Sequence, residues 1–516
     1  MHGINKKTVT EPSLTEAQAL SLTPTGNHTG RSVSVPDKEK ESSFQDLSSD
    51  TLFLIFRHLK LRDIRSLQKV STRLRDLIKE DNALAKAWYS QFSSAHQKQL
   101  RMTLTIKDKH QLRAWFESFS NNQALLESLT DRQPTSTYLP ALLFFTRAEL
   151  MSECETFELV TRATIDIRCE VYSANLSADE RYLVTANGDN TATIFCHEPD
   201  GSWEIKTTIP HEKFVQSPNF SPDSHHVVTV SDDGTANIYG LGCNGTWEAN
   251  TTIRHDLEIS SASFSTDSRH VVTASWDNTA KIHSRKDDGS WVLTAILPHK
   301  KSVNSAIFST DGRHVVTTCM DKTAKIHRQK DNGLWEEEDT IASYANALSA
   351  TFSPDTRYMV TASMDGMARI YSKKADGSWE ENFIIEHRKT VNSATFSPDG
   401  RHLVTASKDY TVKIYGRKAD GFWKEKAIFS HKDWVLSATF SPDSRHVVTA
   451  SYDKTAKIIG QQDDGSWSEK ANIVHGKPIS SATFSADGSQ VITAGFDGIV
   501  KITELRRNHS LSAVTE

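Results

Sequence analysis

The chain has 516 residues, a formal net charge of -5 at pH 7 and 24% charged residues. This length indicates two domains or one large repeat array, and the nearly balanced charge excludes a global attraction to nucleic acid or to an anionic membrane. The five cysteines show no CxxC spacing, so neither a disulfide framework nor a metal site is predicted. No apolar run reaches the ~18 residues of a membrane span, and no signal-peptide pattern opens the sequence. We therefore expect a soluble protein of the cytoplasm or nucleus.

Three segments precede the repetitive part of the chain. Residues 1–42 are rich in Ser, Thr, Glu and Lys, which predicts a disordered tail. In residues 43–90 apolar side chains recur at helical spacing, which predicts a small module of two or three amphipathic helices. Residues 91–156 contain "QLRAWFESF" and "LPALLFFTRAEL" and are predicted to form a helical linker that holds the module rigidly.

From residue 157 onward the sequence repeats every 44 residues. A marker Asp inside "S-x-D-x-T"-like stretches recurs at this interval, at Asp189, Asp233, Asp277, Asp321, Asp365, Asp409, Asp453 and Asp497. A Trp and a His keep the same interval, with Ser343 in the one gap of the His series. Repeats of about 20–50 residues indicate solenoids, propellers or arrays.

One unit has the pattern of four β-strands. "VNSATFSPDG" alternates and ends in a turn, "HLVTAS" is β-branched, "TVKIY" alternates, and "FWKEKAIFSH" follows a turn. Four strands in 44 residues make a propeller blade. The last unit lacks its fourth strand, and Phe157–Ile167 can supply it beside Ile499–Thr503. The sequence thus predicts a mostly β fold, an eight-bladed propeller over residues 157–505, followed by a tail at 506–516.

The unit resembles the repeat of the WD-repeat family. In that family a His before the first strand, a Ser or Thr in the second, an Asp in the next turn and a Trp in the third strand form a hydrogen-bonded set. His387, Thr405, Asp409 and Tyr415 stand at matching spacings. No Trp-Asp dipeptide closes any third strand, which weakens the last link. The resemblance implies that the marker Asp is structural rather than catalytic.

Residues 43–90 resemble an F-box, with Leu-x-Asp-Ile at positions 61–64 in place of the family's Leu-x-Asp-Leu turn. Ser48 replaces the usual Pro, and Leu74 stands where an aromatic residue is common. The resemblance implies that this module binds a Skp-type adaptor. The expected adaptor-binding residues are Leu47, Leu52, Ile55, Phe56, Leu59, Ile64 and Val70. The alternative is a helical cap that packs on the propeller or dimerises.

Together the two resemblances imply the substrate-recognition subunit of a cullin-RING (SCF-type) ubiquitin ligase. Such a chain is not an enzyme and needs no cofactor or metal, and the sequence has no phosphate loop, nucleophile elbow or HExxH motif. Two alternatives stay open. One is a WD-repeat scaffold for complex assembly without a ubiquitin-ligase role. The other is a bacterial effector that mimics such a receptor after secretion into a host cytosol.

The protein substrate is expected on the propeller face that carries the His and marker-Asp loops. Residues just before the marker Asp are unusually apolar, and Lys residues close to the His positions are expected to ring the same face. These groups would capture a target with an acidic or phosphorylated flank, with Lys in place of Arg. The alternative is that these lysines are only solvated and that the aromatic residues only fill space, with no binding role. The predicted substrate-binding residues are Lys213, Trp276, Lys301, Met320, Met364, Lys389, Lys408, Trp434, Tyr452, Lys477 and Phe496.

Overall fold

The computed structural model describes residues 83–92, 97, 148, 151, 156–342, 345–418, 420–462 and 464–507. The predicted adaptor-binding residues and most of the predicted linker lie outside the described residues. Within the predicted helical module, α4 (Ala83–Tyr89) is described, and the Trp88 ring lies edge-on to Phe92 at 4.8 Å. No helix in the described ranges is both long and apolar enough to cross a membrane.

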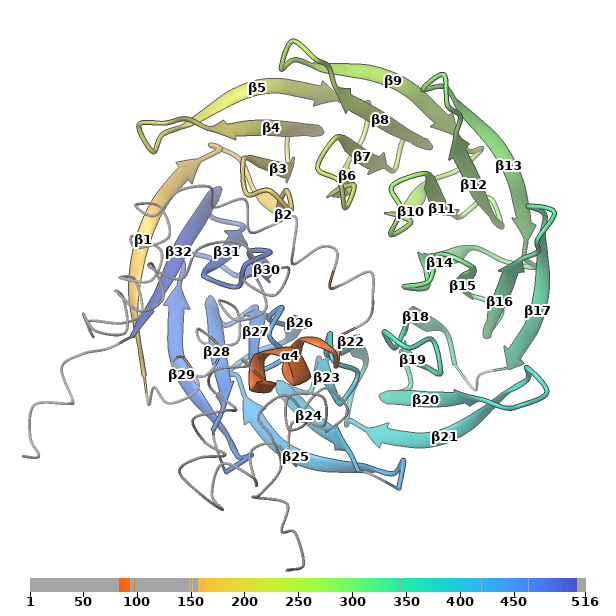
Figure 1. Ribbon diagram of the computed structural model, residues 1–516. Helices are drawn as coiled ribbons and strands as arrows, with labels where there is room; N and C mark the ends of the chain where they lie inside the picture. Colours follow the sequence, from red (N-terminus) through yellow and green to blue (C-terminus); the bar gives the residue numbers. More distant parts are fainter. Residues whose placement is uncertain are drawn as a thin grey trace, which may run out of the picture. The chain divides into compact units, whose positions relative to one another are not determined.

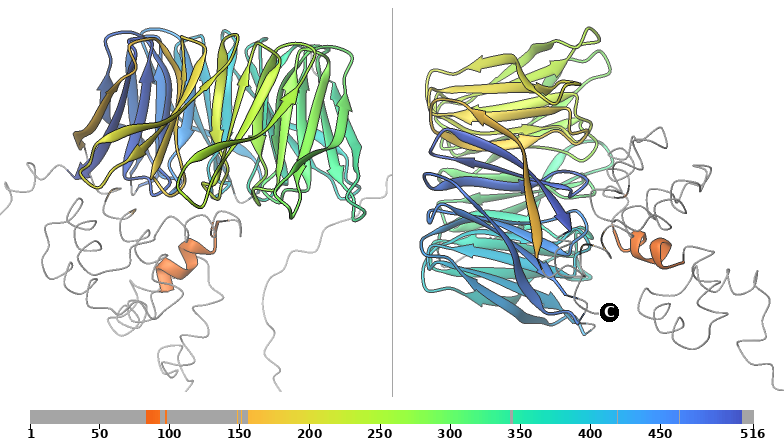
Figure 2. Two further views of the ribbon diagram at one scale, coloured as in Figure 1. Left: turned by 90° about the horizontal axis from the view of Figure 1, so that it is seen from above. Right: turned by 90° about the vertical axis from the view of Figure 1, so that its left-hand side faces the viewer.

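The strands form eight four-stranded antiparallel sheets arranged as a ring around a central opening, so the predicted eight-bladed propeller is confirmed (Figure 1). Seen from the side, the strands run roughly along the ring axis (Figure 2). Blades 1 to 4 contain β2 (Val171–Leu176), β3 (Tyr182–Asn187), β4 (Thr191–His197), β5 (Trp203–Pro210); β6 (Val215–Phe220), β7 (His226–Ser231), β8 (Thr235–Leu241), β9 (Trp247–Arg254); β10 (Ile259–Phe264), β11 (His270–Ser275), β12 (Thr279–Arg285), β13 (Trp291–Pro298); β14 (Val303–Phe308), β15 (His314–Cys319), β16 (Thr323–Gln329) and β17 (Trp335–Ala342). Blades 5 to 8 contain β18 (Ala347–Phe352), β19 (Tyr358–Ser363), β20 (Met367–Lys373), β21 (Trp379–Glu386); β22 (Val391–Phe396), β23 (His402–Ser407), β24 (Thr411–Arg417), β25 (Trp423–Ser430); β26 (Val435–Phe440), β27 (His446–Ser451), β28 (Thr455–Gln461), β29 (Trp467–Val474); β30 (Ile479–Phe484), β31 (Gln490–Gly495), β32 (Ile499–Arg507) and β1 (Phe157–Asp166).

The hydrophobic core lies between neighbouring blades rather than inside one sheet. Val184 and Ile194 of blade 1 pack in one cluster with Val215 and Val227 of blade 2. The second strand of a blade is therefore covered on both faces, which explains its run of β-branched residues without polar alternation. The recurring Trp fastens blades together as well, since the Trp247 ring at the start of β9 lies edge-on to Tyr182 of blade 1 at 5.2 Å.

The N-terminal strand closes the ring, as the strand count predicts. β1 pairs antiparallel with β32, with Thr164 opposite Lys501, and completes blade 8 as its outer strand. The Arg162 Nε atom donates to Glu504 Oε2 over 2.6 Å across this pair. β32 continues to Arg507, past the expected end of the propeller at residue 505. The closing blade thus joins the two ends of the repeat array and leaves no open sheet edge between them.

Candidate protein-binding face

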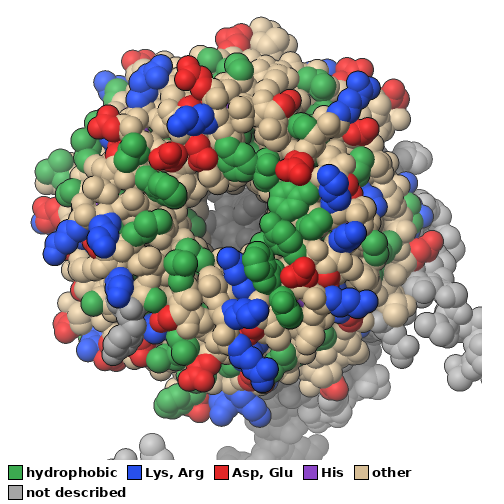
Figure 3. Space-filling view, turned by 180° about the vertical axis from the view of Figure 1, so that it is seen from behind, with side chains coloured by type: hydrophobic (Ala, Val, Ile, Leu, Met, Phe, Trp, Pro, Cys, Tyr) green, Lys and Arg blue, Asp and Glu red, His purple; other side chains and the backbone are tan. Residues whose placement is uncertain are grey.

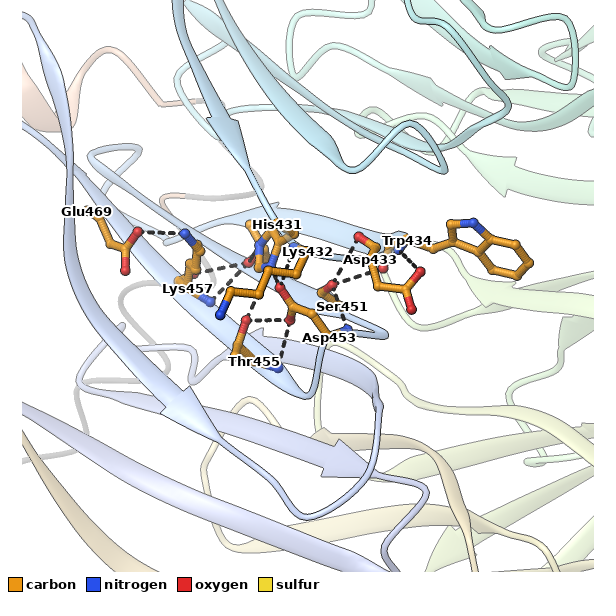
Figure 4. Close-up of polar contacts among 10 residues, drawn as sticks. His431, Lys432, Asp433, Trp434, Ser451, Asp453, Thr455, Lys457 and Glu469 are labelled. Atoms are coloured by element: carbon orange, nitrogen blue, oxygen red, sulfur yellow. Dashed lines mark hydrogen bonds and ion pairs between the residues drawn. The ribbon is translucent and has the colours of Figure 1, made fainter.

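In blades 2, 3, 6, 7 and 8 a hydrogen-bonded set of His, Thr and Asp holds the loops. In blade 7, His431 Nδ1 lies 2.8 Å from Asp453 Oδ2, and its Nε2 lies 2.9 Å from Thr449 Oγ1 (Figure 4). Asp453 also accepts hydrogen bonds from the Lys432 amide at 2.9 Å and from the amide and hydroxyl of Thr455. The set ties the loop that leaves the previous blade to the turn between the second and third strands. The marker Asp is thus structural, as the sequence implies.

The charge state of these sets follows from their burial. Burial lowers the pKa of His431 below its usual value, and the nearby Asp453 opposes this shift. Burial alone would raise the pKa of Asp453, but hydrogen bonds from Thr455 and from the Lys432 amide, together with His431, lower it to about 2. The Asp is therefore ionised throughout the physiological range, where it accepts hydrogen bonds and cannot act as a general acid.

The family's fourth partner is missing, as the sequence suggests. Tyr415, at the Trp position of blade 6, donates to Glu425 at 3.1 Å rather than completing the set. In blade 5, where Ser343 replaces His, Arg369 supplies the partner instead and donates to Asp365 Oδ2 at 2.8 Å. Blade 1 has Ile167 at the His position, and its Asp189 accepts hydrogen bonds from Thr191. The sets therefore differ in strength around the ring.

Replacing Asp409 with Ala is expected to lower the free energy of unfolding by about 1–3 kcal/mol, because His387, the Arg388 amide and Thr411 lose their acceptor. Asp189→Ala is the matched control, since this exposed Asp bonds only Thr191 in the described residues, and its loss should cost less. Urea unfolding of both variants measures the difference. Equal losses would show that the histidine set adds no stability.

The loops that carry these sets form one face of the propeller, shown in Figure 3. On this face a series of aromatic rings contact one another in turn. The ring of Trp434 lies 5.6 Å from Tyr452, which lies 5.8 Å from Phe496. Phe496 lies 5.6 Å from Tyr172, which lies 4.1 Å from Phe214. This series, which we call the aromatic arc, runs through blades 7, 8, 1 and 2. Hydrophobic side chains likewise gather near the central opening in Figure 3.

Lys408 extends the arc into blade 6, and Lys389 makes a separate contact with an aromatic ring of the same blade. The Lys408 ammonium lies over the Trp434 ring at 5.0 Å, and the Lys389 ammonium lies over the Tyr410 ring at the same distance. The Trp434 side chain points away from the polar set of its blade, and the residue is 38% exposed. A large aromatic surface that is half exposed and flanked by cations is available to a partner.

The other predicted residues lie on the same loops but do not join the arc. Trp276 and Met364 are exposed, at 44% and 53%, and Met320 is half-buried. Among the described residues no ring contact links Trp276 to the aromatic arc. Lys213, Lys301 and Lys477 are exposed, and the substrate-binding role of all these side chains stays a prediction.

The lysines do not ring the face evenly, which corrects the sequence interpretation. The loops of blades 1 to 3 carry an acidic sector around Lys213, made of Glu170, Glu212, Asp232, Asp256 and Glu258. The loops of blades 4 and 6 to 8 carry a basic sector, made of Lys300, Lys301, Lys322, Arg388, Lys389, Lys408, Lys432, Lys454 and Lys477. Because the charges separate into two sectors, the electrostatic potential is negative on one side of this face and positive on the other.

Sequence reasoning missed three members of this surface. Phe214 stands three residues after His211, the position that Trp434 holds relative to His431, so the same column of the repeat could have revealed it. Tyr410 directly follows a marker Asp, and no other repeat has an aromatic residue at this position. Tyr172 lies in the innermost strand of blade 1, and its sequence position gives no comparable signal.

The fold defines a β-propeller built from repeated blades, with the aromatic arc on its loop face. Seven segments match the model of the WD domain, G-beta repeat, namely residues 202–240, 247–284, 288–328, 340–372, 380–416, 423–459 and 469–503. Residues 44–86 match the F-box domain. The chain therefore belongs to the WD-repeat family and is an F-box/WD-repeat protein. The unmatched unit is the first, which lacks the His and has Asn187 in place of the usual Ser.

Solved structures support the fold. Sqt1 of Saccharomyces cerevisiae aligns with a TM-score of 0.57 and 13% identity, covering 69% of this chain and 100% of its own. Sqt1 of Chaetomium thermophilum gives a TM-score of 0.58 and 14% identity, with 67% and 99% covered. At these identities the likeness concerns the fold alone. The comparison with curated proteins gives no match.

Proposed function

We propose that the chain is the substrate-recognition subunit of a cullin-RING (SCF-type) E3 ubiquitin ligase. The F-box would bind a Skp-type adaptor, and through it the cullin core, while the propeller would hold the target protein. The chain itself would carry out no chemistry. It would raise the local concentration of substrate lysines beside a conjugating enzyme that carries ubiquitin. Such a receptor works in the cytoplasm or the nucleus.

The observation that carries this proposal is the presence of an F-box and a WD-repeat propeller in one chain. The aromatic arc supports a partner on the loop face, because Trp and Tyr are favoured as energetic centres of protein interfaces. The basic sector next to Trp434 favours a target with an acidic or phosphorylated flank. Lys binds a phosphate as a point charge, with less directional geometry than Arg.

Affinity purification with the full chain tests the adaptor half of this proposal. We expect a Skp-type adaptor to co-purify, and Leu47→Ala with Ile55→Ala to abolish this while the propeller stays folded by circular dichroism. Trp434→Ala is the matched control and should keep the adaptor. If the wild-type chain captures partner proteins but binds no purified adaptor, the protein is a scaffold without a ligase role.

Substitutions on the face test the substrate half, with partners identified by proximity labelling. Trp434→Ala or Tyr452→Ala should weaken capture by about 2 kcal/mol, roughly 30-fold, at every salt concentration. Lys301→Glu with Lys389→Glu should act mainly at low ionic strength, where the Debye length reaches ~30 Å at about 0.01 M. Binding measured across a salt series separates the two classes.

Two controls belong to this series. Lys213→Glu lies in the acidic sector and should change capture less than the Lys301 and Lys389 pair. Asp420→Asn lies in a turn between β24 and β25, at the other end of the blade, where Asp420 accepts a hydrogen bond from the Phe422 amide at 3.0 Å. If Asp420→Asn abolishes capture while the aromatic variants bind normally, the partner uses the opposite face.

A further inference from the structure

Blade 4 departs from the other blades in its histidine set. His299 Nε2 lies 2.8 Å from Thr317 Oγ1, as the equivalent His does in blades 2, 3, 6, 7 and 8, but Nδ1 is buried and has no hydrogen-bond partner. In blades 2, 3, 6, 7 and 8 the equivalent Nδ1 lies between 2.7 and 3.2 Å from the marker Asp. Blade 4 also has Cys319 where five other blades have Ser, namely Ser231, Ser275, Ser363, Ser407 and Ser451.

Three potential ligand groups converge at this point. A ring nitrogen of His299, the Cys319 sulfur and a carboxylate oxygen of Asp321 all lie within 4.8 Å of one another, and no other such group occurs in the part of the chain that the structure describes. Asp321 Oδ1 accepts from the amide and hydroxyl of Thr323. Its Oδ2 accepts one long bond, from the Lys300 amide at 3.4 Å, so this oxygen keeps lone pairs for a ligand.

The hydrogen bonds around His299 indicate where its proton lies. The Thr317 hydroxyl lies 3.3 Å from the Lys325 carbonyl oxygen and can donate to it, so the Thr317 oxygen can accept from His299 Nε2–H. A proton on Nδ1 would instead be buried without an acceptor, which is unfavourable. The tautomer that avoids this cost has its free lone pair on Nδ1. This arrangement is typical of metal-binding histidines, whose second nitrogen is fixed by a hydrogen bond.

We propose that His299 Nδ1, Cys319 Sγ and Asp321 Oδ2 bind a zinc ion, with water as the fourth ligand. Zinc accepts nitrogen, thiolate and carboxylate ligands at about 2.0–2.3 Å, which places tetrahedral ligand atoms about 3.3–3.8 Å apart. The observed grouping within 4.8 Å therefore needs only small side-chain rotations. The ion would replace the missing His–Asp hydrogen bond and join the same two loops. These loops carry Lys300, Lys301 and Met320 of the proposed binding face.

Zinc binding changes the contacts of the Cys319 sulfur in a defined way. The thiol releases its proton to solvent. The hydrogen bond that it donates to the Lys301 carbonyl oxygen, which lies 3.1 Å from Sγ, is therefore lost. The Asp321 amide, at 3.3 Å, continues to donate to the thiolate. The competing interpretation is that Cys319 merely replaces a Ser, because Ser407 makes the equivalent contacts with the Lys389 carbonyl and the Asp409 amide.

Metal titration of the full chain separates these interpretations. Both chains are first stripped of metal with a chelator and then given excess zinc. After unbound metal is removed, the wild-type chain should retain one more zinc ion per chain than Cys319→Ser, as measured by mass spectrometry. Cys319→Ser restores the residue that stands in five other blades, so it should fold. With Co²⁺ as probe, the wild-type chain should give a thiolate-to-metal charge-transfer band that the variant lacks.

A matched variant tests the role of the unpartnered nitrogen. Ser407→Cys places a thiol beside His387, whose Nδ1 already lies 3.0 Å from Asp409, and should not add a zinc ion. Equal zinc content in wild type and Cys319→Ser, or the absence of the charge-transfer band from the wild-type chain, would overturn the proposal. A gain of zinc by Ser407→Cys would show that the hydrogen bonding of Nδ1 does not control binding.

Discussion

Deleting residues 157–167 should prevent the formation of a soluble, cooperatively folded propeller. The deletion removes β1, so β32 loses its partner along a pairing that runs from Phe157 opposite Arg507 to Asp166 opposite Ile499. It also removes Phe157 and Leu159 from the hydrophobic cluster between blades 7 and 8. The exposed edge of β32 would then be free to pair with other chains. Size-exclusion chromatography should show aggregates, and a soluble variant with a single sharp melting transition would refute the role of β1.

A cross-strand disulfide tests the same closure in the opposite direction. Thr164→Cys with Lys501→Cys places a pair of cysteines directly opposite each other in the register of β1 and β32. Oxidation should stabilise the ring, typically by about 2–4 kcal/mol, because the disulfide lowers the conformational entropy of the unfolded chain. The control is Thr164→Cys with Ile499→Cys, which is out of register. Peptide mapping identifies the bond, and equal bonding in both pairs would contradict the register.

The second large effect is expected on acidification from pH 7 to pH 5. Burial, with smaller effects of neighbouring charges, lowers the pKa of His283 and of His327 to about 4. In the unfolded chain a His has a pKa of about 6.5, so the unfolded state binds more protons between these values. The free energy of unfolding therefore falls with the pH, by about 1–2 kcal/mol per histidine. Asp409 and Asp453, with pKa values of about 2, lose their contribution only below pH 4.

A variant isolates these two histidines. They occupy the third-strand position that holds Tyr239, Tyr371 and Tyr415 in other blades. The double variant His283→Tyr with His327→Tyr should therefore fold. Its free energy of unfolding should change less between pH 7 and pH 5 than that of the wild type. Urea midpoints at three pH values measure the effect. If the double variant keeps the full pH dependence of the wild type, these histidines are not its source.

Much of the fold could be predicted because a 44-residue period repeats without insertion. The marker Asp fixes the number of blades, and the extra strand at Phe157–Ile167 identifies the closing partner from chain order alone. The resemblance of the His387, Thr405 and Asp409 spacing to the WD-repeat set also implied the structural role of Asp409. These features depend on chain order and on local hydrogen bonding, which the sequence records directly.

The remaining features depend on three-dimensional neighbours and were not predictable in this way. Arg369 replaces the missing His of blade 5 from a different strand, so no position in the His series indicates it. Tyr172 joins the aromatic arc because the innermost strand of blade 1 brings it next to Phe496, which is far away in the sequence. The separation of acidic and basic loops was visible in the sequence, but it gains meaning only once the blades are placed around a ring.

The closure by β1 also has a consequence for synthesis on the ribosome. Arg162 and Glu504, which join the two ends of the ring, are 342 residues apart. At about 5–20 residues per second, β1 would wait roughly 17–70 s for its partner strand to be made. During this time each finished blade presents an uncovered flank to the next, and blades of nearly the same sequence compete for it. Chaperones that shield a growing chain would therefore be most needed before the last blade emerges.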